Sequence, residues 1–459
     1  MPPPSDVAFA EAQGDLCGPV GGLARAAEGL APKRRTGFRS LRMPAVAALL
    51  VGPGALAMLG ENDGPSMLSY ATSGATYGLG FLLPFIMLTF VAAYVVQEMA
   101  MRLGAVTGRG YGELVFQRFG RFWGWTSVVD LALTNLVTLI TEVIAIRLGM
   151  GFFGIPPWAA VASAVLLVAI GSWGGRYSTW ERLAAGLSIF NLLFVAVAVC
   201  ARPSANEVVT SMATWSPLPK AAVQAFLLIL ASNIGATVTP WMLFFQQSAS
   251  VDKGMGRADI RRGRQNTAIG AAIAAVTACA ALVAATPLFN HHVDMSHYQG
   301  GAGFAEALRP IIGAPGAALF ALGLVEAGAV AMLTISASSA YSIAEMISGA
   351  GRSFNASLAK APLFHATNIG IAILAGAVVL IPGAPLLTLS LNANLLATIL
   401  MPAALVFLLM MSSDRQIMGA YANTRTATVL GIAIAVLVAL AGAAYAAVGF
   451  LGALGIHPF

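Results

Sequence analysis

The chain has 459 residues, of which 58% are hydrophobic and only 10% carry a charge. So little charge excludes a soluble domain and predicts an all-α, polytopic membrane protein. The net charge of +6 comes from basic residues in short loops between apolar segments, which indicates membrane topology and not a surface for nucleic acid.

The polar and apolar parts of the chain divide near its beginning. Residues 1–42 are polar and rich in arginine, and no signal-peptide cleavage pattern follows them. We therefore expect a flexible, basic tail in the cytoplasm, followed by one transmembrane domain over residues 43–459.

About eleven apolar segments are long enough to cross a bilayer as helices. Their approximate bounds are 44–72, 76–102, 123–150, 156–173, 181–201, 220–247, 266–289, 314–347, 363–382, 386–411 and 426–453. Basic residues follow every second segment and are nearly absent from the other loops. By the positive-inside bias, we expect an integral protein of a bacterial inner membrane, with a cytoplasmic N-terminus and an outside C-terminus.

The first apolar segment is interrupted by Gly-Glu-Asn-Asp-Gly-Pro-Ser at positions 60–66. Proline lacks an N–H group and glycine loosens the backbone, so the helix should break there. A broken helix is tolerated inside a bilayer only where its freed backbone groups line a cavity enclosed by protein. A carboxylate at such a break, here Glu61 or Asp63, indicates a cation site.

The sixth apolar segment carries a second interruption, Ser-Asn-Ile-Gly-Ala-Thr-Val-Thr-Pro at positions 232–240. Breaks five helices apart are typical of transporters built from two inverted repeats, whose site lies at the bilayer midplane. We therefore expect a LeuT-type 5+5 fold, broken in helices 1 and 6, with repeats at about 43–201 and 220–411 and an additional helix at about 426–453. The alternative is a pair of proline kinks that serve packing.

Several motifs occur in an order that is found in a known family. Gly52-Pro53 precedes Asp-Gly-Pro-Ser at positions 63–66, and positions 236–241 read Ala-Thr-Val-Thr-Pro-Trp. Between these two motifs, positions 106–110 read Val-Thr-Gly-Arg-Gly, and after them positions 414–415 read Asp-Arg. Over nearly all apolar segments the chain thus resembles the Nramp family of divalent metal transporters, which carries Asp-Pro-Gly-Asn and Ala-Thr-Val-Met-Pro-His at the two breaks.

The resemblance implies that Asp63 coordinates the cation, while Ser66 and Thr239 replace the family's Asn and Met ligands. A thioether is a soft ligand, whereas hydroxyl and carboxylate oxygens are hard. The replacement favours a hard cation such as Mg²⁺ or Mn²⁺ over soft transition metals, held by Asp63, Ser66, Thr239 and the carbonyl of Ala236. The alternative role of the small residues is close packing of helices.

Further candidates for the substrate pathway are Glu61, Gly64, Thr237, Trp241 and Asn394. Glu61 is a second ligand or a gate residue, or else a solvated group in a vestibule. Asn394 falls where the family has a glutamine near the site, and its alternative role is a hydrogen bond between helices.

Two carboxyl groups of other segments are candidates for binding a proton or another coupling ion. Glu142 matches a glutamate of the family's proton route, but the family's companion aspartate is Leu139 here, which argues against proton coupling in the family's manner. The alternative for Glu142 is an ion pair with Arg147. Glu326 is a vestibule or coupling group, or else a packed, protonated acid.

These features favour a secondary active transporter that moves a divalent cation across the lipid bilayer by alternating access, with H⁺ or Na⁺ as the candidate coupling ion. The alternative is an H⁺- or Na⁺-coupled symporter of a small organic solute, with Trp241 shaping an apolar pocket. The sequence has no nucleotide-binding loop and no nucleophile–base pair, so it predicts neither an enzyme nor a cofactor.

Overall fold

The structure is a computed structural model that describes residues 51–173, 175–218, 223–294, 301–347, 352–383 and 386–453. Within these ranges the chain forms helices and no strands, so the predicted all-α class is confirmed. The predicted basic tail, residues 1–42, lies outside the described residues.

The helices follow the predicted apolar segments in chain order. The long or membrane-embedded ones are α4 (Pro53–Gly60), α5 (Gly64–Tyr77), α6 (Leu82–Thr107), α8 (Arg121–Phe152), α9 (Pro157–Trp173), α10 (Tyr177–Ser188), α11 (Leu193–Cys200), α13 (Val223–Gly235), α14 (Pro240–Asp252), α15 (Ile260–Asn290), α16 (Gly301–Met346), α17 (Pro362–Val379), α18 (Leu386–Ser413) and α20 (Arg425–Ala453). Short helices α7 (Tyr111–Phe119), α12 (Ala205–Thr214) and α19 (Arg415–Met418) lie in the connections.

Among the described residues, nine helical stretches are long and apolar enough to cross a membrane. The first predicted segment is not one of them because it is divided into α4 and α5, and α9 is shorter than the other spans. The polytopic membrane class is confirmed, while the total of eleven spans and the repeat boundaries stay predictions.

Two segments differ from their predicted form. The fifth begins at Tyr177 and is interrupted by a 3₁₀ turn, η1 (Ile189–Leu192), between α10 and α11. The eighth begins at Gly301, earlier than predicted, and kinks at Gly313, whose φ of 80° lies in the left-handed region. Glycine adopts that region without a steric penalty, so the helical stretch bends there and continues on both sides, with Pro310 and Pro315 inside it.

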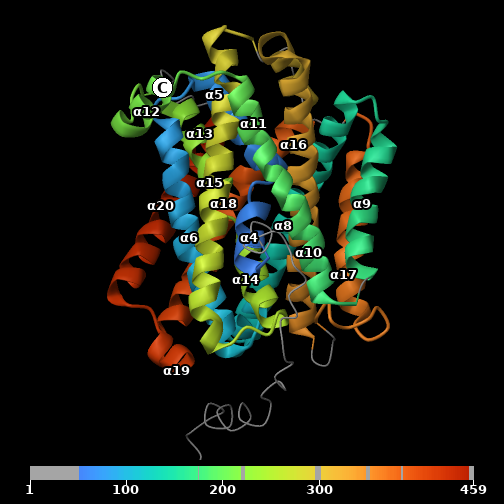
Figure 1. Ribbon diagram of the computed structural model, residues 1–459. Coiled ribbons are helices and arrows are strands. Elements are labelled where there is room, and N and C mark those ends of the chain that lie inside the picture. The colour runs from blue at the N-terminus through green and yellow to red at the C-terminus, as the bar shows by residue number, and fades with distance from the viewer. Residues whose placement is uncertain are drawn as a thin grey trace, which may run out of the picture. The chain divides into compact units, whose positions relative to one another are not determined.

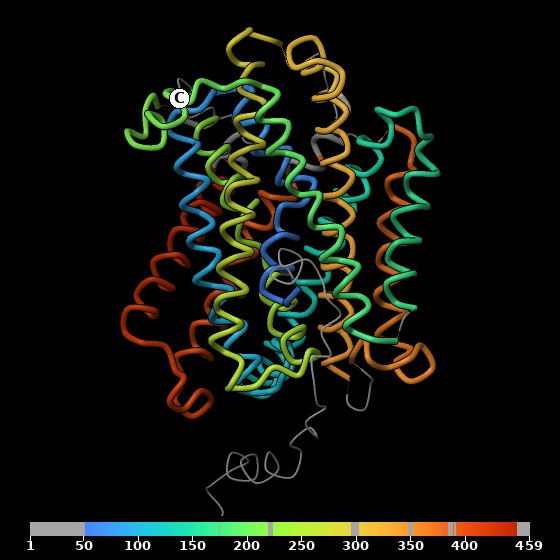
Figure 2. Tube along the Cα trace, in the orientation of Figure 1, coloured from blue at the N-terminus to red at the C-terminus, as the bar shows by residue number. Residues whose placement is uncertain are grey.

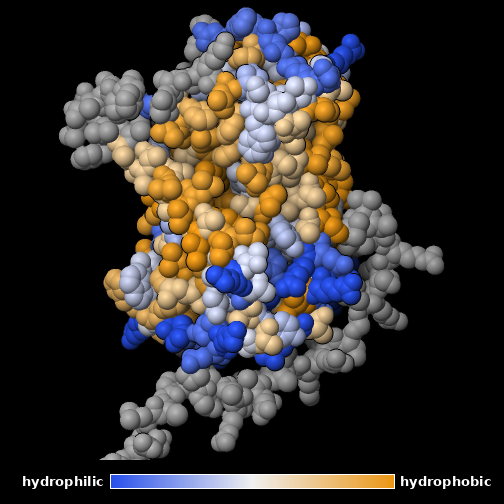
Figure 3. All heavy atoms as spheres, turned by 90° about the vertical axis from the view of Figure 1, so that its left-hand side faces the viewer, coloured by the Kyte–Doolittle hydropathy of each residue, from blue (hydrophilic) through white to orange (hydrophobic). Residues whose placement is uncertain are grey.

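Hydrophobic side chains form a band across one face of the molecule. Figure 3 shows this band between two hydrophilic rims, on the side where α20 lies in Figure 1. Helix α20 exposes Val429, Ile432 and Leu440, each at least half accessible. Such a surface fits the hydrocarbon core of a bilayer, with the rims at its two faces.

The broken segments lie in the middle of the fold (Figure 1). Helices α4 and α5 follow one another along the blue part of the trace (Figure 2), and both pack against α15. Helix α14 packs against α4, α6 and α16, and α16 makes its most extensive contact with α8. Helices α9 and α17 pack on each other at one side, and α20 covers α18 at another.

Glycines allow several of these helices to approach closely. A Cβ atom placed on Gly74 of α5 would lie 2.0 Å from the carbonyl oxygen of Leu282 in α15. One placed on Gly235, at the end of α13, would lie 1.9 Å from the carbonyl oxygen of Asn394 in α18. Both contacts are with backbone, which cannot rotate away, so the helix spacing depends on these two residues.

We expect Gly74→Ala to lower the free energy of unfolding by about 1–3 kcal/mol, because the added methyl group overpacks the contact between α5 and α15. Gly186→Ala in α10 is the matched control, since nothing lies within 4 Å of its Cβ position. Thermal unfolding of the purified protein in detergent measures both variants. Equal melting temperatures for the two variants would contradict the close approach.

Candidate functional site

The break in the first segment is built from three residues between two helices. Helix α4 ends at Gly60, and α5 begins at Gly64 with Pro65 in its first turn. The Asp63 carboxylate caps α5 by accepting a hydrogen bond of 2.9 Å from the backbone N–H of Ser66. The predicted break is confirmed, and the carboxylate that breaks the helix also satisfies one of its unpaired amides.

The break in the sixth segment also divides it into two helices, here with four residues between them. Helix α13 ends at Gly235, and α14 begins at Pro240 with Thr239 in the capping position. The hydroxyl of Thr239 donates to both carboxylate oxygens of Glu61, at 3.0 and 2.9 Å. This contact joins the two breaks directly, side chain to side chain.

Three carboxyl groups gather at this junction. Besides Glu61, these are Asp63 and Glu142 of α8. The backbone N–H of Gly64 donates to Oε2 of Glu142 at 2.9 Å. None of the three residues is more than 1% exposed, and no basic side chain among the described residues forms an ion pair with them.

Buried carboxylates without a basic partner attract cations strongly, because their charge is neither solvated nor compensated. In the part of the chain that the structure describes, no three His, Cys, Asp or Glu side chains form a group able to hold a metal ion. A cation at Asp63 would therefore need carbonyl or hydroxyl oxygens from the two breaks, which are the ligands that hard cations prefer.

The predicted ligands differ in the hydrogen bonds that they make. The hydroxyl of Ser66 is buried and has no partner among the described residues, so its lone pairs are available. The carbonyl of Ala236 already accepts a hydrogen bond of 2.8 Å from the Tyr70 hydroxyl. The hydroxyl of Thr239 donates to the Glu61 carboxylate, so its hydrogen is already engaged.

Two of the predicted pathway residues hold the helices together. The hydroxyl of Thr237 lies 3.0 Å from that of Tyr70 and 2.9 Å from that of Thr89 in α6. A Cβ atom on Gly64 would lie 2.2 Å from Cβ of Ala145 in α8. Both residues therefore fix the approach of neighbouring helices around the breaks.

Trp241 and Asn394 differ in their relation to the site. The Trp241 ring lies against the first break, since a Cβ on Gly60 would be 3.2 Å from it. Its indole N–H is buried and has no acceptor among the described residues. The Asn394 side-chain amide likewise has no acceptor there, while its backbone carbonyl accepts from Thr398 at 2.9 Å.

The structure bears on one of the two alternatives for Glu142. The ion pair with Arg147 is not formed, and Arg147 donates instead to the carbonyl of Val379 at 2.7 Å. Glu142 faces Gly64 on the side of the first break. Its backbone carbonyl lies against Gly328 of α16, where a Cβ atom would come within 2.8 Å.

Glu326 lies apart from the three gathered carboxyls and bonds to Asn191 of η1, at 3.1 Å. Sequence reasoning did not single out Asn191, Asn62 or Tyr70, although each has a role here. A polar amide in the apolar fifth segment was the available signal for Asn191. Tyr70 lies seven residues after Asp63, on the same face of the helix.

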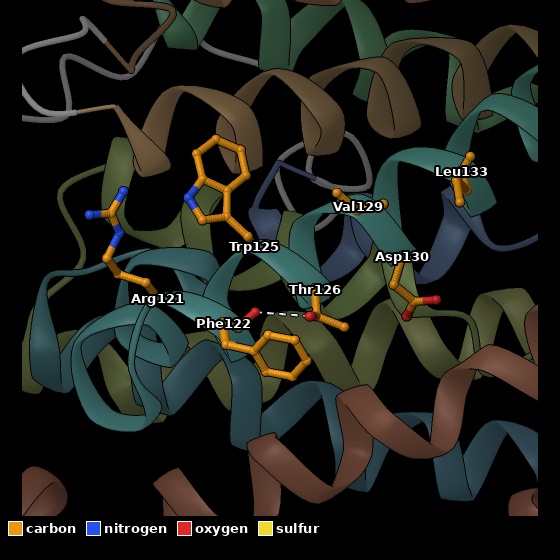
Figure 4. Close-up of a pocket in the computed structure, with 7 residues that line it drawn as sticks. All are labelled: Arg121, Phe122, Trp125, Thr126, Val129, Asp130 and Leu133. Carbon is orange, nitrogen blue, oxygen red and sulfur yellow. Dashed lines mark hydrogen bonds between the residues drawn. The ribbon is translucent and has the colours of Figure 1, made fainter.

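A separate pocket lies on the outer side of α8. Arg121, Phe122, Trp125, Thr126, Val129, Asp130 and Leu133 line it. Figure 4 shows these side chains along successive turns of the helix, with the Thr126 hydroxyl bonded to the Phe122 carbonyl at 2.8 Å. None of the residues at the two breaks lines it, so this pocket is not the cation site.

Comparison with known proteins gives one family. Residues 54–447 match the family model described as natural resistance-associated macrophage protein-like, Nramp. The divalent metal cation transporter MntH of Mycobacterium tuberculosis is 26% identical over 408 residues, which cover 85% of this chain and 89% of that protein. The protein of the same name from Klebsiella pneumoniae is 25% identical over 414 residues, or 86% and 92% of the two chains.

Solved structures show the same fold. A crystal structure of the Eremococcus coleocola manganese transporter superposes with a TM-score of 0.74 at 21% identity, covering 92% of this chain and 91% of that one. The nucleobase-cation-symport-1 family transporter Mhp1 superposes with a TM-score of 0.54 at 14% identity, covering 85% and 91%. At these identities the likeness concerns the fold alone.

We expect Tyr70→Phe to lower the free energy of unfolding by about 1–3 kcal/mol, because the buried carbonyl of Ala236 loses its donor. Tyr77→Phe is the control on the same helix, since its hydroxyl makes no hydrogen bond within the described part of the chain. Thermal unfolding in detergent compares the two. A loss no larger than that of Tyr77→Phe would show that the hydroxyl does not support the second break.

Proposed function

Because this chain belongs to the Nramp family, we propose that it is a secondary active transporter that carries a divalent metal cation across a membrane. The observation that carries the proposal is the meeting of the two helix breaks around Glu61, Asp63 and Glu142. These carboxyls are buried at mid-fold and have no basic partner among the described residues. A divalent cation supplies the positive charge that this arrangement requires.

Asp63 is the principal ligand in this proposal. One of its oxygens already caps α5 through the Ser66 amide, so the carboxylate is held in place before the cation arrives. The free hydroxyl of Ser66 lies in the same turn and supplies a second oxygen. Backbone carbonyls freed at the breaks, including that of Ala236, complete the shell, and the Ala236 carbonyl then shares or gives up the hydrogen bond that it accepts from Tyr70.

The proposed cation is hard, such as Mg²⁺ or Mn²⁺. Thr239 stands where a thioether would favour softer metals, and its hydroxyl is bonded to the Glu61 carboxylate. That hydrogen bond points a second carboxylate at the junction of the breaks. An oxygen-only set of ligands with two acidic groups suits small, hard divalent ions.

Alternating access requires one side of the pathway to be shut while the other opens. The end of α14 supports a shut cytoplasmic side, because Asp252 accepts from the Tyr341 hydroxyl at 2.7 Å and from the Phe354 backbone at 3.0 Å. The adjacent Lys253 pairs with Glu181 of α10 at 2.6 Å. These hydrogen bonds and the ion pair hold the second half of the sixth segment against α10 and α16. They must break before a cation is released on this side.

We also propose the topology that the basic loops indicate: a bacterial inner-membrane protein with its N-terminus in the cytoplasm and its C-terminus outside. Arg102, Arg118 and Arg264 lie in the loops or helix ends of one rim and pair with Glu98 or Asp414. A gradient of H⁺ or Na⁺ would drive the transport, since secondary transporters take their energy from a second ion.

The replacement Asp63→Asn should abolish uptake of Mn²⁺ and Mg²⁺ into proteoliposomes, because it removes the charge of the principal ligand. The matched control is Asp130→Asn, which removes a carboxylate of α8 that lies on the outer pocket. Calorimetry should show metal binding in the control and none in Asp63→Asn. Uptake of an organic solute, with no binding or movement of any divalent ion, would replace this proposal by that of a solute symporter.

The replacement Thr239→Met should shift selectivity towards Cd²⁺ over Mg²⁺ by roughly tenfold, because it adds a soft ligand and frees Glu61 from its hydrogen bond. Thr239→Val is the control, since it removes the hydroxyl without adding sulfur. The ratio of the two binding constants is measured by calorimetry. The same ratio in all three proteins would place Thr239 away from the cation.

A further inference from the structure

Glu326 is a carboxyl group in the middle of a long helix without a charged partner. It lies in α16 and is 5% exposed. Its Oε1 accepts a hydrogen bond of 3.1 Å from the side-chain amide of Asn191. Its Oε2 is buried and has no partner among the described residues. If the Glu326 carboxyl is ionised here, no positive charge on a described neighbouring residue compensates it.

Asn191 connects this carboxyl to the first helix break. It lies in η1, the 3₁₀ turn that interrupts the fifth segment, and its Nδ2 also faces the carbonyl of Leu59 at 3.4 Å. Its Oδ1 accepts a hydrogen bond of 2.8 Å from Nδ2 of Asn62. Asn62 lies between Glu61 and Asp63, so two amides lead from Glu326 to the metal-binding turn.

Several oxygens around this chain of amides have unused capacity. Oδ1 of Asn62 is buried and has no partner in the described residues, like Oε2 of Glu326. Leu59 lies in the last turn of α4, whose carbonyls carry the negative end of the helix dipole. Two unpartnered oxygens and a helix end favour a positive charge beside Glu326.

Within the part of the chain that the structure describes, no charged group of the neighbouring elements supplies a positive charge to Glu326. Glu142 of α8 and Glu61 are themselves acidic, and they face Gly64 and Thr239. Asn191 alone bonds to Glu326 among the described side chains, and no lysine, arginine or histidine pairs with it there.

We propose that Glu326 binds a second, monovalent cation, H⁺ or Na⁺, and that Asn191 and Asn62 transmit its binding to Asp63. This inference rests on the proposed transport function and adds the site of the coupling ion. A cation on the unpartnered Oε2 of Glu326 withdraws negative charge from the carboxyl and weakens the hydrogen bond that Oε1 accepts from Asn191, so the Asn191 amide is released to turn or move. Asn62 follows because its own side chain is bonded to Asn191 and to the carbonyl of Ala274, at 3.0 Å.

The competing interpretation is a carboxyl that stays protonated and only packs. Glu326→Gln separates the two, because glutamine has the same shape and is permanently neutral. Glu306→Gln is the matched control, an exposed glutamate of the same helix. Asn191→Ala tests the transmission, since it leaves the carboxyl in place and removes its link to Asn62.

The experiment is Mn²⁺ uptake into proteoliposomes under an inward H⁺ gradient, under an inward Na⁺ gradient, and with neither. We expect one gradient to raise uptake several-fold in the wild type and in Glu306→Gln. Glu326→Gln and Asn191→Ala should lose this stimulation while they keep Mn²⁺ affinity within a few-fold of the wild type. The gradient that stimulates identifies the cation, and stimulation that persists in Glu326→Gln overturns the inference.

A second readout does not depend on metal movement. Infrared difference spectra, taken on addition of Na⁺ or after a pH step, should contain a carboxyl band that Glu326→Gln removes. A wild type that shows the band but moves no metal would contradict the proposed function and leave this site standing. A wild type without the band, or a band that survives in Glu326→Gln, overturns the inference.

Discussion

A helix that breaks inside a bilayer must find partners for its freed amides and carbonyls within the protein, and the rest of this structure depends on that constraint. At the first break, Asp63 caps α5. At the second, the Tyr70 hydroxyl donates to the carbonyl of Ala236, and Thr239 holds the capping position before α14. At the first break the group that caps the helix, Asp63, is also the principal candidate ligand.

The distribution of charge follows from the same geometry. Glu61 and Asp63 lie at the first break, and Glu142 reaches it from α8. Neutral donors hold these groups: a hydroxyl from Thr239 and a backbone amide from Gly64. Such donors orient a carboxylate without neutralising it, which leaves its charge for a cation that comes and goes.

The arrangement of the carboxyl groups also depends on the close approach of neighbouring helices. Glycine at positions 64, 74, 235 and 328 faces a methyl group or backbone carbonyls of neighbouring helices. At Gly64 and Gly328 the neighbour is α8, close to Glu142. A side chain at either position would push α8 away and move the Glu142 carboxyl from the break. Small residues therefore place a charged group here, in addition to their usual packing role.

The composition, the apolar segments and the two polar interruptions were sufficient to predict an all-α membrane protein broken at positions 60–66 and 232–240. Asp63 could be singled out because a carboxylate beside a proline in a membrane span is costly to bury and rarely serves packing alone. The shape of the fifth and eighth segments could not be predicted, since η1 and the kink at Gly313 depend on contacts and backbone angles that apolarity does not encode.

The sequence by itself thus determined which helices break and which carboxyl groups lie at the first break, because proline, glycine and charge act locally on the chain. Only the tertiary structure decided that Thr239 faces Glu61, that Glu142 turns to Gly64 and away from Arg147, and that Asn191 joins Glu326 to Asn62. Each of these contacts joins residues far apart in the chain. Such contacts are set by the packing of helices in three dimensions, which no local pattern of residues specifies.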